Sequence, residues 1–133
     1  MGQRDRMAPS LAEIEDLARA TLARIPASLR RELTDLVVRV VDLPDDETVR
    51  TMDLDGPYDL LGMYRGINLR DRSVAQVPDD VDMIFLYRLS LLDYWIESGE
   101  DLGDLVRHVL IHEIGHHFGF SDAEMASIED SSS

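Results

Sequence analysis

Apolar residues recur at helical spacing in two long segments of the chain. In residues 11–25 the apolar positions are Leu11, Ile14, Leu17, Ala18, Leu22 and Ile25. Ser10 and Glu13 form a capping-box pattern at the start of this segment, and Pro26 ends it. In residues 101–118 the apolar positions are Leu102, Leu105, Val106, Val109, Leu110 and Ile114. Both patterns predict amphipathic helices with one face in the core.

Three shorter segments are typical of β-strands. Residues 36–41 are rich in valine, and residues 83–87 form an unbroken apolar run that predicts a strand buried on both faces. Residues 60–69 contain two glycines and predict a strand pair or a bulged strand. Proline-containing turns are predicted at residues 56–57 and 78–80.

Shorter helices are predicted between and after the strands. One begins at residues 44–47, another covers residues 89–97 with Trp95 packed inward, and the last covers residues 122–128. Together with the longer segments, these elements predict an α+β fold in which helices pack on a small sheet.

Length and composition limit the classes of function. The 133 residues fit one domain, expected at residues 10–130, between a flexible N-terminus (1–9) and a disordered tail (131–133). The formal net charge of −14 argues against partners such as nucleic acid or an anionic membrane. The absence of cysteine excludes disulfides and thiolate ligands. With no signal-peptide pattern and no membrane-spanning apolar run, we expect a soluble cytoplasmic protein; the oligomeric state leaves no signal.

All four histidines lie close together in the second long helical segment. They are His108, His112, His116 and His117. On a helix, residues four apart differ by about 40° in azimuth and about 6 Å in rise, so His112 and His116 project from one face. Two imidazoles in this arrangement can share one metal ion of zinc type.

Three further residues extend this metal-site pattern. Glu113 lies about 100° around the helix from His112, where its carboxylate can take a proton from water held by the metal. Gly119 falls at the expected helix end, where glycine adopts the left-handed conformation without strain. The chain reversal at this point brings Asp122 back as a candidate third ligand. Residues 121–124 are also a capping-box pattern, and the two roles of Asp122 are compatible.

The other residues around the histidines have structural interpretations. His108 lies about 12 Å of rise from His116, so we expect a hydrogen-bonded, partly buried side chain rather than a ligand of the same ion. His117 points about 100° away from His116 and is expected to contact the body of the protein. Glycine inside a helix costs up to about 1 kcal/mol, so we expect a strand or substrate to approach Gly115 closely. Met125 is expected in the core.

Beyond these residues, the sequence resembles a known family. The pattern HExxHxxGxxD at residues 112–122 matches the extended zincin motif in the variant with Asp as third ligand. Residues 60–66 look like the Gly-Leu-Tyr-x-Gly segment of the small bacterial zincin-like metallopeptidases, also called minimal zincins. Residues 77–85 are similar to that family's Pro-Asp turn and apolar strand, and the whole resemblance covers residues 35–128.

The resemblance implies a fold, a cofactor and an activity. The fold would be a compact zincin-like α+β fold with a small mixed sheet against the active-site helix. One zinc ion (Zn2+) per chain would be bound by His112, His116 and Asp122. Glu113 would be the catalytic base in the hydrolysis of peptide bonds, so the expected partner is a peptide or protein substrate.

Some features of the function stay open at this point. An additional oxyanion donor is expected, and Tyr64 and Arg65 are candidates because of their place in the glycine-flanked segment, with core packing as the alternative for Tyr64. An extended peptide is expected to add to a sheet edge beside the helix. The alternative function is a metal-stabilised protein-interaction module with a catalytically silent zincin-like site, and hydrolysis of a non-peptide amide or ester uses the same residues.

Overall fold

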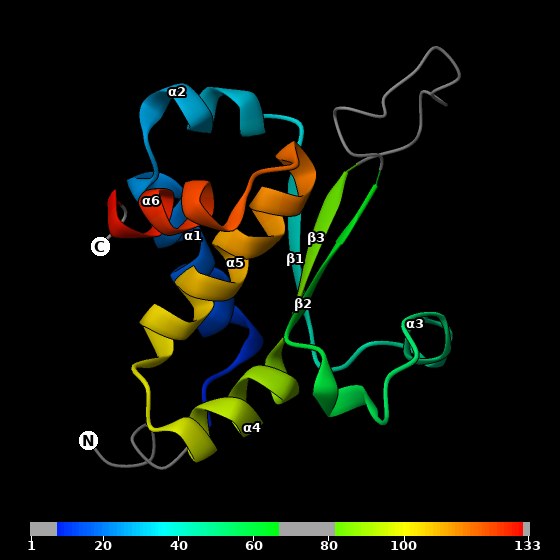
Figure 1. Cartoon of the computed structure of the whole chain (residues 1–133). Helices are drawn as coiled ribbons and strands as arrows, with labels where there is room; N and C mark the ends of the chain where they lie inside the picture. The colour runs from blue at the N-terminus through cyan, green and yellow to red at the C-terminus, as the bar shows by residue number, and fades with distance from the viewer. Residues whose placement is uncertain (1–7, 67–81, 132–133) are drawn as a thin grey trace, which may run out of the picture.

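The computed structural model describes residues 8–66 and 82–131, and Figure 1 shows most of their helices gathered on one side of a small sheet. The elements are, in chain order, α1 (Leu11–Arg24), α2 (Ala27–Arg30), the 3₁₀ helix η2 (Arg31–Leu33), β1 (Val37–Val41), α3 (Asp46–Thr51), the 3₁₀ helix η3 (Pro57–Asp59), β2 (Gly62–Arg65), β3 (Met83–Tyr87), α4 (Arg88–Ser98), α5 (Leu102–Phe118) and α6 (Asp122–Ser131). None of the helices in these residues is both long enough and apolar enough to cross a lipid bilayer.

The three strands form a mixed sheet in the order β1-β3-β2. The central strand β3 runs parallel to β1, with Val38 beside Ile84 and Val40 beside Leu86. It runs antiparallel to β2, where Tyr64 lies opposite Ile84. This arrangement confirms the predicted α+β class and its small mixed sheet, and among the described strands β2 lies at an edge.

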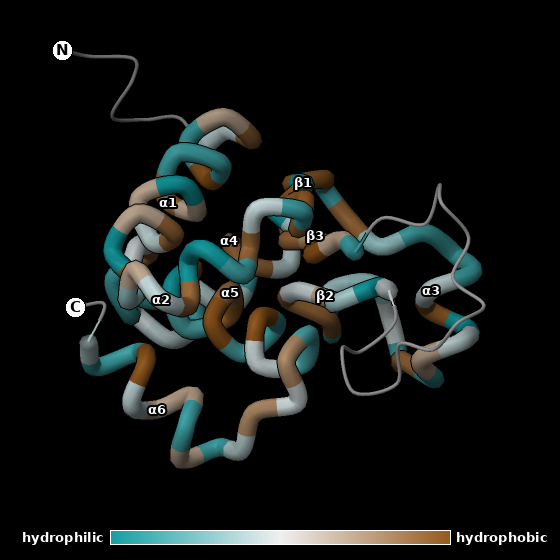
Figure 2. The backbone as a smooth tube through the Cα atoms, turned by 90° about the horizontal axis from the view of Figure 1, so that it is seen from above, coloured by the Kyte–Doolittle hydropathy of each residue, from teal (hydrophilic) through white to brown (hydrophobic). Residues whose placement is uncertain are grey.

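The hydrophobic core lies between the sheet and the helices α1 and α5, which pack on the same side of the sheet in both ribbon views (Figures 1 and 2). The predicted apolar faces of the two long helices are confirmed, except that Leu11 is exposed in the first turn of α1. Trp95 of α4 packs against this core, as predicted. The largest fully buried core side chains include Ile14, Ile84, Leu86, Leu105, Leu110 and Ile114.

The strand β3 is fully buried on one face and partly buried on the other, which corrects the prediction that both faces of residues 83–87 are buried. Ile84 and Leu86 are fully buried beneath the helices, whereas Met83 and Phe85 on the opposite face are half-buried. The physical reason is that α1 and α5 pack on the face of Ile84 and Leu86, whereas the second face is covered more fully at Tyr87, which is 2% exposed, than at Met83 and Phe85.

The glycine-containing segment at residues 60–69 forms one strand over the residues that the structure describes. Of the predicted residues 60–69, β2 covers Gly62–Arg65. Residues 67–69 and the predicted turn at 78–80 lie outside the described residues.

Most helix ends follow the predicted capping signals. The Ser10 hydroxyl accepts the backbone N–H of Glu13 at 3.1 Å, and the Glu13 carboxylate accepts the N–H of Ser10 at 3.3 Å. At the start of α5 the Asp101 carboxylate accepts the N–H of Asp104 at 3.0 Å. One boundary differs from the prediction: α6 continues to Ser131, whose hydroxyl donates to the carbonyl of Ser127, so Ser131 belongs to a helix rather than to a disordered tail.

Gly115 allows α6 to cross α5 at a short distance. A Cβ atom at Gly115 would overlap the sulfur of Met125 and lie 2.7 Å from its Cγ. Met125 itself is 4% exposed, which confirms its predicted place in the core. The predicted close approach at Gly115 is real, but the neighbour is the Met125 side chain rather than a strand or a substrate.

We expect Gly115→Ala to destabilise the protein, although alanine is the better helix former. The gain in helix propensity is up to about 1 kcal/mol, whereas overpacking a filled core costs about 1–3 kcal/mol. Urea unfolding in the presence of a chelator measures the balance. The control is the same substitution in a Met125→Ala background, where the space is free and alanine should stabilise. An equal loss of stability in both backgrounds would rule out Met125 as the cause.

Candidate metal centre

The C-terminal turn of α5 directs the chain that follows the histidines. Gly119 has φ 73° and ψ 35°, in the left-handed region, and its N–H donates to the carbonyl of Gly115. The N–H of Phe120 donates to the same carbonyl at 2.9 Å. Glycine adopts this conformation without a Cβ penalty, so the helix ends here as predicted and the chain reverses into α6 (Figure 1).

His112 and His116 both lie in the C-terminal half of α5. His112 is half-buried, and neither of its ring nitrogens has a hydrogen-bond partner among residues 8–66 and 82–131. His116 is exposed, and its Nδ1 lies 3.2 Å from Oε1 of Glu113. Neutral imidazole nitrogens are common zinc ligands, so the pair retains the donor chemistry that the sequence predicted.

Glu113 is buried, with 9% of its surface exposed, and its carboxylate is bound to the sheet. Oε1 accepts the backbone N–H of Tyr64 in β2 at 2.7 Å. Within this strand pair the N–H of Tyr87 donates to the carbonyl of Leu61, so strand alternation directs the Tyr64 N–H away from β3 and toward α5. A buried carboxylate requires such a donor, and here a backbone N–H of β2 that points away from β3 supplies it.

Asp122 is an exposed residue in the first turn of α6. The capping box predicted around it is present: the Ser121 hydroxyl accepts the N–H of Glu124 at 3.2 Å, and the Glu124 carboxylate accepts the N–H of Ser121 at 2.9 Å. Asp122 is not part of the metal-capable group of side chains found in the described ranges. The ligand set His112, His116 and Asp122 therefore stays a prediction.

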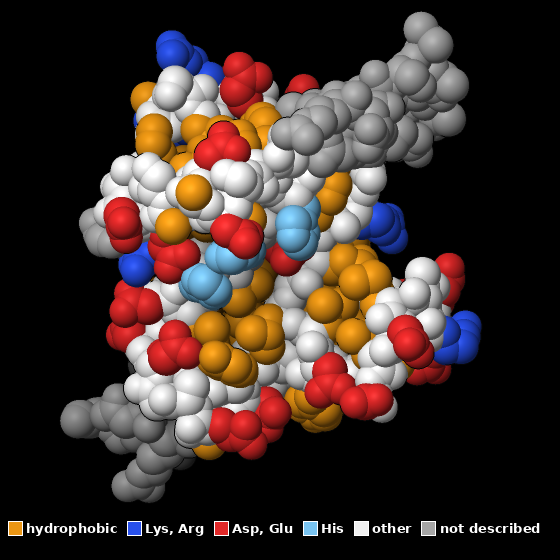
Figure 3. All heavy atoms as spheres, viewed as in Figure 1, with side chains coloured by type: hydrophobic (Ala, Val, Ile, Leu, Met, Phe, Trp, Pro, Cys, Tyr) orange, Lys and Arg blue, Asp and Glu red, His pale blue; other side chains and the backbone are white. Residues whose placement is uncertain are grey.

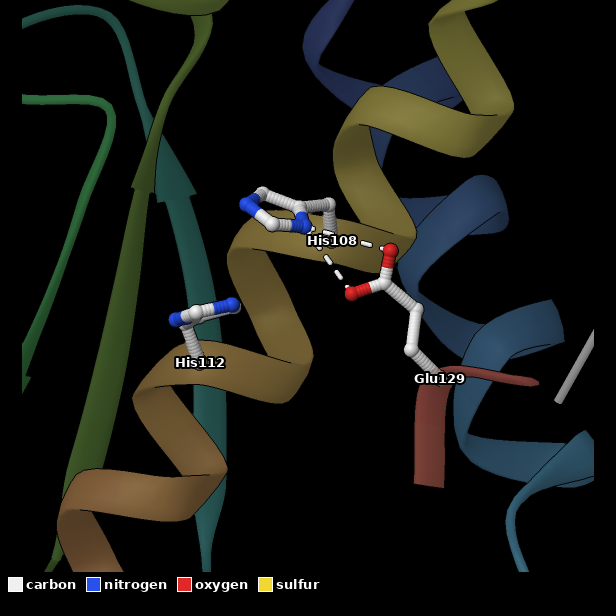
Figure 4. A group of neighbouring side chains, drawn as sticks. All are labelled: His108, His112 and Glu129. Carbon is white, nitrogen blue, oxygen red and sulfur yellow. Dashed lines mark hydrogen bonds and ion pairs between the residues drawn. The ribbon is translucent and has the colours of Figure 1, made fainter. Parts of the chain in front are cut away.

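The side chains that do gather are His108, His112 and Glu129. One ligand atom from each of them lies within 4.8 Å of the other two, the only such group in residues 8–66 and 82–131. Nδ1 of His108 is 2.9 Å and 3.1 Å from the two carboxylate oxygens of Glu129 (Figure 4). His108 is thus hydrogen-bonded, as predicted, but it is exposed rather than partly buried because it faces the solvent side of the α5–α6 contact.

Glu129 is the residue that sequence reasoning missed. It follows Met125 by four residues, so both side chains lie on one face of α6. Since Met125 packs on Gly115, that face is turned toward α5. Glu129, one helical turn later, therefore meets His108 of α5. The glycine within the helix and the methionine at this spacing were the available signals.

A second, buried polar group joins the sheet to α5. The Tyr64 hydroxyl donates to Oδ1 of Asp82 at 3.1 Å and lies 3.3 Å from Nδ1 of His117. His117 is 4% exposed and Asp82 8%, and the two side chains approach to 3.7 Å. His117 therefore contacts the body of the protein, as predicted, and Tyr64 has a structural role in which its hydroxyl is engaged.

Two further residues of the sheet, Tyr87 and Arg65, lie in different surroundings. Burial raises the pKa of Tyr87 to about 12, and the Asp45 and Glu113 carboxylates add to that effect, so the phenol is protonated at neutral pH. The Arg65 guanidinium lies 5.4 Å from the centre of the Phe85 ring, on the sheet face opposite to Ile84. Arg65 is thus directed away from α5.

We expect Tyr64→Phe to lower the free energy of unfolding by about 1–3 kcal/mol, because it leaves Asp82 and His117 without the hydroxyl in a buried site. Chemical denaturation measures this loss. The matched control is Tyr58→Phe at a tyrosine that is 47% exposed, where we expect a change within about 0.5 kcal/mol. Equal effects of the two substitutions would contradict the structural role of the Tyr64 hydroxyl.

Fold and motif together define a zincin-like arrangement, in which the helix that carries the HExxH pattern packs against the edge strand of a small sheet. The model of the zincin-like metallopeptidase family matches residues 33–131, so this chain belongs to that family. A search of curated proteins finds no match to the chain.

Proposed function

We propose that this protein is a zinc-dependent peptidase that hydrolyses peptide bonds, with Glu113 as the catalytic base. The observation that carries the proposal is the position of the Glu113 carboxylate. It is buried, it follows His112 directly in the helix, it lies 3.2 Å from Nδ1 of His116, and the Tyr64 N–H of the adjacent strand orients it. A carboxylate beside two zinc-type ligands, fixed by a backbone donor, is suited to proton transfer.

The donor set fits zinc in its chemistry. Two imidazoles four residues apart on α5 and one carboxylate are a usual zinc ligand combination. We assign His112, His116 and Asp122 as the ligands, in agreement with the family motif. A zinc ion so bound supplies Lewis acidity, which polarises a carbonyl and makes water a stronger acid near neutral pH.

The chain's own residues would then handle the proton. Oε1 of Glu113 is engaged with the Tyr64 N–H, so we assign Oε2 as the oxygen that accepts a proton from the attacking water. The same oxygen then delivers the proton to the leaving amine. Because the Tyr64 donor is a backbone group of the sheet, the carboxylate keeps its orientation during both transfers.

We expect Glu113→Gln to retain zinc and lose at least about 100-fold in kcat, because an amide cannot accept the proton. Gln keeps the oxygen that binds the Tyr64 N–H, so the fold should persist. The matched control is Glu97→Gln at an exposed position of α4. Turnover of a fluorogenic peptide library measures the loss. A Gln variant as active as wild type would remove Glu113 from the mechanism. A zinc-loaded wild type that shows neither turnover nor hydroxamate binding would favour the alternative function, a metal-stabilised protein-interaction module.

We expect the wild-type protein, purified without an affinity tag, to contain about one zinc per chain. In Asp122→Ala we expect the affinity for zinc to fall by roughly tenfold or more. Elemental analysis and competition with a chelator measure content and affinity. The matched control is Asp130→Asn, an exposed acid near the other end of α6. Unchanged zinc affinity in Asp122→Ala would remove Asp122 from the ligand set while leaving the role of Glu113 to be judged by the previous experiment.

The substrate class follows from the edge strand and the charge. Among the described strands β2 lies at an edge of the sheet and packs against α5, so a peptide extended along this edge would pass the Glu113 carboxylate. The net charge of −14 favours neutral or basic peptides and disfavours nucleic acid and anionic membranes as partners.

We also propose that the protein acts in the cytoplasm.

A further inference from the structure

We propose that His108, His112 and Glu129 form a second metal-binding site, separate from the predicted catalytic ligand set but sharing His112 with it. The site would take one divalent transition-metal ion such as Zn²⁺ or Co²⁺. Figure 3 shows histidine side chains in a row across one face of the molecule with acidic side chains beside them, and the second site lies at the α5–α6 contact (Figure 4).

The distances within this group are close to those between the ligands of a bound metal ion. His108 and His112 are one turn apart on α5, and their ring centroids are 4.3 Å apart. The ligand atoms of all three residues lie within 4.8 Å of one another. In a tetrahedral zinc site the ligand atoms are roughly 3.4 Å apart, so small side-chain rotations bring this group to ligand distances without moving the backbone.

The ligand atoms are accessible to an ion from solvent. The side chain of His108 is 52% exposed and that of Glu129 is 25% exposed. The ring nitrogens of His112 accept or donate no hydrogen bond within the described part of the chain. Binding of an ion would replace the His108–Glu129 hydrogen bond by two stronger ligand bonds.

The local charge favours a cation. A shallow cavity of about 250 Å³ is lined by His108 and Glu129 and by two further acids, Glu100 and Asp104, with Arg107 as the basic residue among the described lining. This excess of negative charge raises the local concentration of cations. Two imidazoles and one carboxylate select zinc, cobalt, nickel or copper over magnesium and calcium, which prefer oxygen ligands.

The shared residue couples this site to the one proposed above. An ion on His108 and Glu129 that also takes His112 removes one ligand from the catalytic set. Metal in excess of one equivalent would then lower peptidase activity; this consequence, unlike the binding itself, rests on the proposed function.

Cobalt binding tests the site independently of activity. The catalytic set is removed in a His116→Ala/Asp122→Ala double variant, in which both changes are at exposed positions. We expect this variant to bind one Co²⁺ per chain by titration calorimetry and visible absorption. Adding His108→Ala or Glu129→Gln should weaken that binding by roughly tenfold or more. Adding Asp130→Asn, one residue along α6, should leave it unchanged.

Two results would overturn the proposal. One is a double variant that binds no Co²⁺ while far-UV circular dichroism shows it folded. The other is Co²⁺ affinity that His108→Ala and Glu129→Gln do not alter, in which case the His108–Glu129 pair is only a hydrogen bond between helices. Neither result bears on Glu113, whose role is decided by turnover of the otherwise intact protein.

Discussion

The arrangement of the site depends on the hydrogen bond between the Glu113 carboxylate and the backbone N–H of Tyr64. A carboxylate with 9% exposure has lost most of its hydration and must recover that energy from donors nearby. The donor is a main-chain group of β2 that points away from β3, so its position is set by the sheet rather than by a side chain. This bond therefore joins α5 to the sheet at a buried carboxylate.

The crossing of α6 over α5 is the second constraint, and it decides which acids approach the histidines. Gly115 and Met125 form the contact, and Met125 lies between Asp122 and Glu129 in α6. These two acids are seven residues apart, so they lie on nearly the same side of the helix about two turns apart. The structure places Glu129 against His108 and leaves Asp122 exposed at the first turn.

Local signals in the sequence predicted the fold well where a few neighbouring residues decide the outcome. The capping box at Ser10, the glycine stop at Gly119 and the strand at residues 83–87 are of this kind. What the sequence could not supply were contacts between distant elements. The anchoring of Glu113 by Tyr64 and the approach of Glu129 to His108 depend on how β2 and α6 dock on α5, which no periodicity encodes. The half-buried positions of Met83 and Phe85 in β3 were missed for the same reason, because an apolar run does not reveal what covers each face.

The mixed sheet also has a consequence for the order in which contacts form. The helices α5 and α6 are consecutive and joined by a short turn, so the contacts between them close short loops. The Glu113–Tyr64 bond spans 49 residues, and the parallel pairing of β1 with β3 spans a similar distance. Long loops close more slowly than short ones, and non-local pairings dominate folding times. We therefore expect the histidines to be displayed on a helical hairpin before the Glu113 carboxylate is fixed against β2, so that the arrangement of this site belongs to the completed fold alone.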